Sequence, residues 1–181
     1  TLSVGFLNED FIFSGSMSGQ GNLTKIGTGI FTLTGTNSNS GLTSITEGTL
    51  KVTGSLSDST DVNVSSGAIY DVDQTDTIGS IAGAGSIEIA GAKTLSAGGL
   101  NTDTEVSGVI SGGGGFSKRG TGTTTLSGGN TYSGATSIGE GTLKVTGTLS
   151  DSTAVNVSSG AAYEVEQTDT IGSIAGAGSI E

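Results

Sequence analysis

Two pairs of acidic residues could do chemistry in this chain. Asp71 and Asp73 are two positions apart, as are Glu164 and Glu166, and residues with this spacing share one face of a β-strand. Each pair could act as the acid and base of a glycosidase or supply oxygen ligands to Ca²⁺. However, catalytic groups need placement within about 0.5 Å, and the exchange of Asp for Glu moves the carboxylate by more than that. We therefore predict solvated strand positions, and no catalytic, cofactor-binding or metal-binding residue.

Other kinds of site find little support. The chain has no His and no Cys, which excludes a Ser-His-Asp triad, a Cys-His dyad and a metal site rich in nitrogen or sulfur. The glycine-rich stretch Ser111 to Gly120 superficially resembles a phosphate-binding loop. It lacks the G-K-[ST] ending, and no helical pattern follows it. We interpret this stretch as a corner between strands.

The composition limits both the structure and the partners. Gly (34), Thr (28) and Ser (27) make up nearly half of the 181 residues, yet Pro is absent, as expected of long paired strands in which every backbone N–H is needed. The net charge of −11 argues against nucleic acid or an anionic membrane as a partner. No stretch approaches the ~20 apolar residues of a membrane-spanning helix.

The chain is a tandem duplication. Shifting the sequence by 93 positions aligns it with itself without a gap, and residues 47–88 differ from residues 140–181 at only five of 42 positions. We assign residues 1–93 to the first copy and residues 94–181 to a truncated second copy. No linker composition separates them, so we predict one continuous solenoid.

A shorter rhythm lies within each copy. Apolar residues alternate with polar ones in pairs such as Leu50 and Val52, which indicates strands with one buried face. Landmarks recur every 17 to 20 residues, which fits five coils per copy; they are Leu50, Tyr70, Ile89, Val109, Leu126, Leu143 and Tyr163. Short strands at this spacing, joined by glycine-rich corners, favour a parallel β-helix of about nine to ten coils.

The differences between the copies test this strand phase. Asp61, Ile69, Asp71 and Asp73 are replaced by Ala, Ala, Glu and Glu in the second copy, whereas the residues between them are identical. A packed interior resists substitution more than a solvated surface does. We therefore predict an inward-facing core that includes both copies of four residues, namely Val62, Val64, Tyr70 and Val72 with Val155, Val157, Tyr163 and Val165.

Each copy also contains a longer motif with regularly spaced glycines. In the first copy it begins at Gly19-Gln20-Gly21-Asn22-Leu23-Thr24-Lys25-Ile26-Gly27-Thr28-Gly29 and continues through Thr32-Leu33-Thr34-Gly35 to Thr46-Glu47-Gly48-Thr49-Leu50. This motif resembles the passenger-associated strand repeat of bacterial autotransporters. The second copy keeps the family's N-T-Y-[ST]-G segment as Asn130-Thr131-Tyr132-Ser133-Gly134, whereas the first has Asn37-Ser38-Asn39-Ser40-Gly41. Lys25 and Lys118 fall on the family's lysine position, where we expect exposed corners.

The resemblance implies a right-handed, single-stranded parallel β-helix in a secreted, surface-displayed passenger of a Gram-negative bacterium. It implies a non-enzymatic stalk that aids secretion across the outer membrane, with adhesion to surface glycans or proteins of a host or of the environment as a further role. A translocator barrel is expected in the parent chain and is not recognised in this sequence, which we interpret as an excised fragment. Uncapped terminal coils would also permit self-association end to end.

Two other functions remain open. The alternative is a β-helix protein that degrades or binds polysaccharide, because this fold hosts such enzymes; fold alone does not imply that function. A third possibility is binding to ice or another crystal surface through Thr32-Leu33-Thr34. That function needs the Thr-x-Thr motif at matching positions in successive coils, and the second copy does not keep it.

Overall fold

The computed structural model describes all residues 1–181, and every regular element in it is a β-strand. One sheet of ten strands runs along the whole molecule, with bounds β1 Leu2–Val4, β3 Leu23–Lys25, β5 Thr43–Ile45, β7 Asp61–Val64, β10 Ser80–Gly83, β13 Thr104–Val106, β16 Thr123–Leu126, β18 Thr142–Val145, β20 Ala162–Val165 and β22 Ser179–Ile180. None of its elements is a helix, so the structure offers no apolar helix that could cross a membrane.

Two six-stranded sheets form the other faces. The sheet on the N-terminal side contains β2 Phe11–Phe13, β4 Ile30–Leu33, β6 Thr49–Val52, β8 Ile69–Val72, β11 Ser86–Ile89 and β14 Ile110–Ser111. The sheet on the C-terminal side contains β9 Asp76–Thr77, β12 Thr94–Ala97, β15 Gly115–Lys118, β17 Thr136–Ile138, β19 Ala154–Val157 and β21 Ser173–Gly176.

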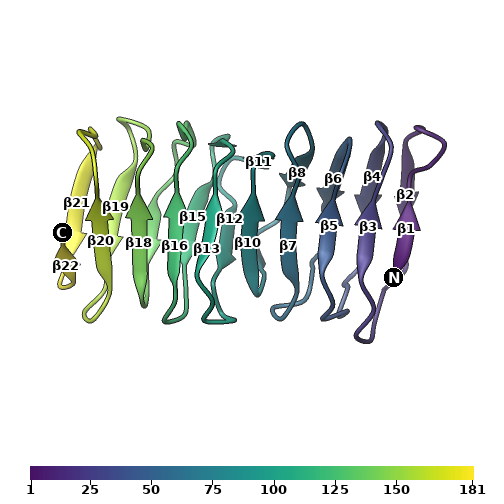
Figure 1. The fold of residues 1–181 in the computed structure, drawn as a ribbon, viewed down its shortest axis with the longest axis horizontal. Coiled ribbons are helices and arrows are strands. Elements are labelled where there is room, and N and C mark those ends of the chain that lie inside the picture. Colours follow the sequence, from purple (N-terminus) through teal and green to yellow (C-terminus); the bar gives the residue numbers. More distant parts are fainter.

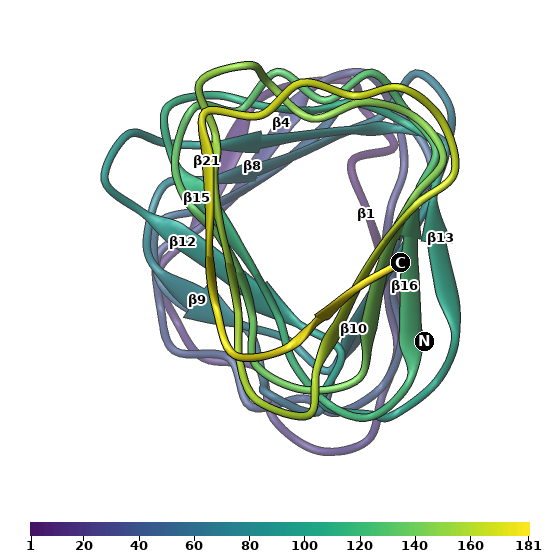
Figure 2. The ribbon, with the colours of Figure 1, turned by 90° about the vertical axis from the view of Figure 1, so that its left-hand side faces the viewer.

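These sheets form a parallel β-helix. Neighbouring strands in each sheet pair in parallel, and register partners in the ten-stranded sheet are 17 to 23 residues apart. The coils stack into an elongated body with the two termini at opposite ends (Figure 1). Seen from one end, the coils trace a roughly triangular outline (Figure 2). Ten strands in the long sheet correspond to about nine turns, which confirms the predicted fold.

The alternation predicted from the sequence describes the interior correctly. Val62, Val64, Tyr70 and Val72 are all buried, and so are Val155, Val157 and Tyr163, whereas Val165 is half-buried and packs against the core. The strand interior is thus apolar and the exterior polar, as period-two patterning requires. One landmark was wrong by a single position. Val109 is 38% exposed, and Ile110 beside it is the buried residue.

The two copies are continuous but do not contain five coils each. β5 lies in the ten-stranded sheet, whereas its counterpart β17, 93 positions later, lies in a six-stranded sheet. The counterpart of β6 is β18, which has moved from a six-stranded sheet into the ten-stranded one. Equivalent strands of the two copies therefore lie on different faces of the β-helix. The reason is that 93 residues are not a whole number of coils.

Candidate functional site

The acidic pairs lie on the outer surface, where each is bound to a lysine. Lys51 on β6 and Asp71 on β8 are register partners, and the Lys51 Nζ donates to the Asp71 Oδ2 at 2.8 Å. The same ammonium group also contacts Asp73. These carboxylates raise the pKa of Lys51 by hydrogen bonding, chiefly through Asp71 and then Asp73.

The second copy repeats this arrangement with longer acidic side chains. Lys144 on β18 pairs in register with Glu164 on β20, with 3.0 Å between Lys144 Nζ and Glu164 Oε1. Glu166 contacts the same ammonium group, and the two carboxylates raise the pKa of Lys144, Glu166 most. The change from Asp to Glu keeps the ion pair, because an exposed, flexible side chain can change its conformation at little energetic cost. This behaviour is typical of a solvated ladder between coils.

No set of side chains converges as a metal site would require. The structure contains no group of three or more His, Cys, Asp or Glu residues that could hold a metal ion. The glycine-rich stretch from Ser111 to Gly120 forms the end of β14, a turn, and then β15. Its first part is thus the predicted corner, and its second part is a strand of the wall.

The lysines of the repeat motif are buried, contrary to the prediction of exposed corners. Lys25 is 0% exposed and Lys118 is 1% exposed, whereas Arg119 beside Lys118 is on the surface. The strand pattern explains this burial. Lys25 is two residues after the buried Leu23 on β3, and side chains two positions apart on a strand point to the same side. The same reasoning applies to Phe116 and Lys118 on β15.

Each buried ammonium group is bound by three backbone carbonyl oxygens. Lys25 Nζ donates to the oxygens of Ile26 at 2.9 Å and Gly27 at 2.7 Å, and to that of Glu47 on the next coil at 3.2 Å. An ammonium group has three donors, so its hydrogen-bonding capacity is fully used. Burial lowers the pKa of Lys25, and the charges of Glu47 and Asp10 oppose that effect.

Lys118 is bound by the same kind of carbonyl cage, a set of three backbone carbonyl oxygens, but in a different sheet of the β-helix. Its Nζ donates to Arg119 O and Gly120 O, both at 2.6 Å, and to Glu140 O at 3.3 Å. Burial lowers the pKa of Lys118 as it does that of Lys25, against the opposing charges of Glu140 and Asp103. The lysine therefore joins the corner of its own coil to the corner of the following coil.

The corner around each lysine needs glycine. Gly27 and Gly120 have φ values of +70° and +68°, which side chains rarely adopt. A Cβ atom at Gly27 would lie 2.1 Å from the carbonyl oxygen of Gly5 on the preceding coil, and Gly120 has the same contact with Gly98. The coils thus approach each other too closely at this corner for any other residue.

Buried asparagines join coils on another face. Asn37 Oδ1 accepts a hydrogen bond from the Met17 backbone N–H at 3.0 Å, and its side-chain amide donates to the carbonyl of Ser55 at 3.1 Å. Asn130 makes the equivalent bonds with Ile110 and Thr148. Each side chain therefore bridges the coil before and the coil after its own. These residues are the asparagines of the repeat motif, and they are structural.

The tyrosine of the motif is also internal. The Tyr132 hydroxyl lies 2.6 Å from the Thr136 Oγ1, and both side chains are fully buried. In the first copy, Asn39 replaces the tyrosine, and both Asn39 Oδ1 and Thr43 Oγ1 lack a hydrogen-bond partner. The replacement therefore leaves two buried polar atoms unsatisfied. Tyr70 and Tyr163 lie in the core, as predicted, but their hydroxyls also lack partners.

Comparison with known proteins agrees with these positions. The model of the passenger-associated-transport-repeat family matches residues 23–52 and 116–145, which span β3 to β6 and β15 to β18. The adhesin BmaC autotransporter of Brucella suis biovar 1 (strain 1330) is 37% identical over 152 residues, which is 79% of this chain and 4% of that protein. No solved structure matches the chain.

The chain thus spans only a small part of that relative. The matched segments contain the caged lysines and the bridging asparagines, and both segments form consecutive walls of a parallel β-helix. Two segments of this chain thus match the passenger-associated-transport-repeat model, and the chain is a parallel β-helix that is similar to a short part of an autotransporter adhesin.

Proposed function

We propose that this chain is a non-enzymatic, rigid segment of a secreted passenger that is displayed on the surface of a Gram-negative bacterium. It acts as a stalk, and its outer face contributes to adhesion to surface glycans or proteins. One observation carries the proposal. The lysine and the first asparagine of each repeat motif face inward and bind the backbone of neighbouring coils, so these residues specify a rod rather than a binding site.

The same contacts support a role in secretion. Lys25 and Lys118 each bond to a carbonyl oxygen on the next coil, and Asn37 and Asn130 each bond to the coils on both sides. A chain that emerges from a membrane gradually can add one coil at a time, because every completed coil offers a template of unpaired strands and bonding partners. Folding outside the cell would then oppose backward movement of the chain.

Adhesion is supported by the similarity to an adhesin and by the outward ladders. The charged ladder of Lys51 and Asp71 lies on a different sheet from that of Lys144 and Glu164. Because each repeat is rotated by one face, the rod presents equivalent ladders in different directions. Several weak contacts in such an arrangement can add to a firm attachment.

The secretion role can be tested in the parent passenger. We would replace Lys25 and Lys118 together with Met and measure the fraction of passenger that external protease can reach. The matched control replaces the outward lysines Lys51 and Lys144 with Met. We expect surface display to fall only in the first variant. Equal display of both variants would contradict a role of the inward repeat residues in secretion.

The enzyme alternative and the adhesive role can be tested with the purified chain. A panel of acidic and neutral polysaccharides, with and without Ca²⁺, would be assayed for new reducing ends or unsaturated products. We expect none; turnover that Asp71→Asn or Glu164→Gln abolishes would overturn the proposal. The same panel, immobilised beside extracellular proteins, would be assayed for binding, and the absence of binding to all of them would remove the adhesive part.

A further inference from the structure

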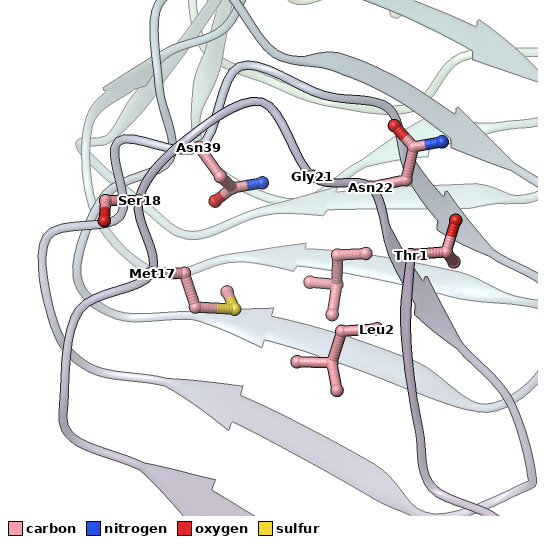
Figure 3. Close-up of a pocket in the computed structure, with 8 residues that line it drawn as sticks. Thr1, Leu2, Met17, Ser18, Gly21, Asn22 and Asn39 are labelled. Atoms are coloured by element: carbon pink, nitrogen blue, oxygen red, sulfur yellow. The ribbon is translucent and has the colours of Figure 1, made fainter.

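A polar hollow lies on the outer surface of the rod, where three neighbouring strands of one six-stranded sheet end and turn. These strands are β12, β15 and β17, and β12 and β15 lie in the middle of the elongated body (Figure 1). The volume of the hollow is about 500 Å³, within the range of about 300–1,000 Å³ that is usual for small-molecule sites. None of its lining residues is apolar, and four of them carry polar or charged side chains, namely Asn101, Ser117, Arg119 and Glu140. The hollow at the first coil is different, because the apolar Leu2 and Met17 line it together with Asn39 (Figure 3).

Two glycines of this hollow are not required by the fold. A Cβ atom at Gly99 would have no atom within 4 Å, and one at Gly139 would contact only the carbonyl oxygen of Lys118, at 3.5 Å. Neither residue has a positive φ, whereas Gly120 has both a positive φ and a close contact at its Cβ position. Gly99 and Gly139 therefore leave space on the outer surface without serving a turn.

The first copy has the same corners but different residues at the positions that open the hollow. Gly99, Arg119 and Gly139 replace Phe6, Ile26 and Thr46, which lie 93 positions earlier. In the first copy, the Thr46 Oγ1 donates a hydrogen bond to the Lys25 carbonyl oxygen at 2.8 Å, and a glycine cannot make that bond. The second copy has thus lost a hydrogen bond and two side chains, and it has gained an arginine in the space between them.

The positions of the hollow that are identical in the two copies have structural roles. The Asn101 Oδ1 accepts a hydrogen bond from the Thr121 N–H at 2.8 Å, and Asn8 binds Thr28 in the same way at 2.9 Å. Gly120 corresponds to Gly27, and both have φ values near +70°. The differences between the copies at this site therefore fall on residues that shape the hollow, whereas the residues that hold the corner are unchanged.

The backbone beneath the hollow is fixed by the buried Lys118. The three carbonyl groups that its ammonium group binds belong to Arg119, Gly120 and Glu140, and all three residues line the hollow. The strand ladder also continues through the site, since the Arg119 N–H donates to Ala97 O at 2.8 Å and the Gly139 N–H donates to Lys118 O at 2.9 Å. A site that is already ordered loses little conformational entropy when a ligand binds.

Arg119 brings a cation without a partner to the hollow. It is the only arginine of the chain, and it is exposed. All four ion pairs of the structure belong to Lys51 and Lys144, so Arg119 forms no ion pair, even though Glu140 lines the same hollow. A guanidinium group binds a carboxylate through two parallel hydrogen bonds, which indicates a ligand that carries a carboxylate.

We propose that this hollow binds a sugar that carries a carboxylate, namely a uronate or a sialate residue of a glycan. Arg119 pairs with the carboxylate, and the other polar side chains bind the hydroxyl groups. The inference rests on the adhesive role proposed above and assigns it a site and a ligand class.

The lining residues favour a sugar acid over two other kinds of ligand. Sugar hydroxyls both donate and accept hydrogen bonds, so they suit a lining that combines the acceptor Glu140 with the amide group of Asn101 and the hydroxyl of Ser117. An acidic peptide would bring further carboxylates toward Glu140 and no such hydroxyls. A neutral sugar would leave the charge of Arg119 without a partner, and the hollow has no aromatic side chain that could contact a sugar ring.

The experiment is a titration of the purified, ¹⁵N-labelled chain, followed by the NMR shifts of its backbone amides. The probes are a trimer of galacturonic acid with its neutral methyl ester, sialyllactose with neutral lactose, and a hexaglutamate peptide. The two acidic sugars distinguish a uronate from a sialate, and the peptide tests whether a carboxylate alone is sufficient.

Two substitutions copy residues of the first copy into the hollow, so the fold should tolerate them. Arg119→Ile removes the cation, and Gly139→Thr narrows the hollow. Lys93→Ile is the control for the charge, because Lys93 contacts Gln74 outside the hollow. Gly91→Thr is the control for the added side chain, because a Cβ atom there would have no atom within 4 Å.

We expect at least one acidic sugar to shift the amides of Gly99, Asn101, Arg119 and Gly139, and its neutral counterpart to shift none of them. Arg119→Ile should weaken binding by about tenfold or more, because a hydrogen-bonded charge pair is lost. Gly139→Thr should also weaken it, whereas both control variants should keep the affinity within about twofold, because solvent screens distant charges.

Four results would overturn this site. They are unchanged affinity in Arg119→Ile, equal binding of an acidic sugar and its neutral counterpart, binding of hexaglutamate at least as tight as that of the sugars, and no binding of either acidic sugar. The adhesive role itself would still stand if the chain bound another member of the glycan and protein panel described above. If the chain bound no member of that panel and neither acidic sugar, both the site and the adhesive role would be excluded.

Discussion

Lys118 lies inside the wall of the β-helix, and its ammonium group reaches the carbonyl oxygen of Glu140 on the following coil at 3.3 Å. A charged group is rarely buried in so narrow a core, because desolvation costs several kcal/mol per ion. The cost is offset here by three carbonyl acceptors at the corner. These acceptors would themselves be left without partners if the lysine were absent.

Removing this ammonium group should therefore destabilise the fold. We expect Lys118→Met to lower the free energy of unfolding by about 2–4 kcal/mol, because it leaves buried carbonyl groups unpaired. Lys144→Met is the control, since the ion pairs of Lys144 lie on the outer surface, where solvent screens them. Urea denaturation followed by circular dichroism measures both. Similar losses in the two variants would show that the carbonyl cage contributes little to stability.

The strand phase can be tested within β7. Val64 is 1% exposed and Asn63 beside it faces solvent. Val64→Asp should cost several kcal/mol by burying an unpaired charge, whereas Asn63→Asp should cost under about 0.5 kcal/mol. Thermal melts of the two variants, which carry the same new side chain, give the comparison. A larger loss in Asn63→Asp would mean that the faces had been assigned the wrong way round.

Asp76 should make stability depend on pH. Burial raises its pKa to about 6, although backbone hydrogen bonds from Leu56 and Thr77 lower it. Because the folded-state pKa lies above the unfolded value near 3.8, the protonated form favours folding. This contribution is fully present below pH 4 and is lost as the pH rises to about 6.

The measurement compares the pH dependence of unfolding in matched variants. Asp76→Asn should gain stability relative to the unmodified chain between pH 4 and pH 7, by about 3 kcal/mol at most, because the pKa rises from 3.8 to about 6 and each pKa unit is worth 1.36 kcal/mol. Asp169→Asn, at the corresponding and more exposed position of the second copy, is the matched control for the substitution itself. A difference for Asp76→Asn that does not change with pH would argue against burial of the Asp76 charge.

The imperfect motif of the first copy offers a stabilising substitution. Asn39 occupies the position of Tyr132, and it leaves its own Oδ1 and the Thr43 Oγ1 without partners. Asn39→Tyr should restore the hydroxyl pair and fill part of the adjacent hollow, which would raise the unfolding free energy by roughly 1 kcal/mol. Tyr132→Phe should lower it by a similar amount, because it removes only the hydrogen bond. Thermal denaturation of both variants decides the matter, and a destabilised Asn39→Tyr would show that the hollow cannot accept the ring.

The motif residues show where sequence reasoning succeeded and where it failed. The alternation around Tyr70 placed that side chain in the core correctly, because the faces of a strand depend only on neighbouring positions. The same rule, applied to Leu23 and Lys25, would have placed the lysine inside. A lysine is almost never fully buried unless it is paired, and its partners are carbonyl groups on a corner and on the next coil. Those partners are invisible in the local sequence.

The amino-acid sequence by itself determined the strands, their buried faces, the duplication and the repeat family, because each depends on short-range patterns or on direct comparison of residues. The tertiary structure alone decided how the coils close. Corner glycines and inserted residues set the length of each turn. A segment joins a given sheet only where its backbone can form hydrogen bonds with the strand of the preceding coil. For this reason β5 and β17 have the same sequence, Thr-Ser-Ile, and yet lie on different faces. The period of 93 residues is the length of the duplicated unit, whereas the length of a coil is set by packing between turns.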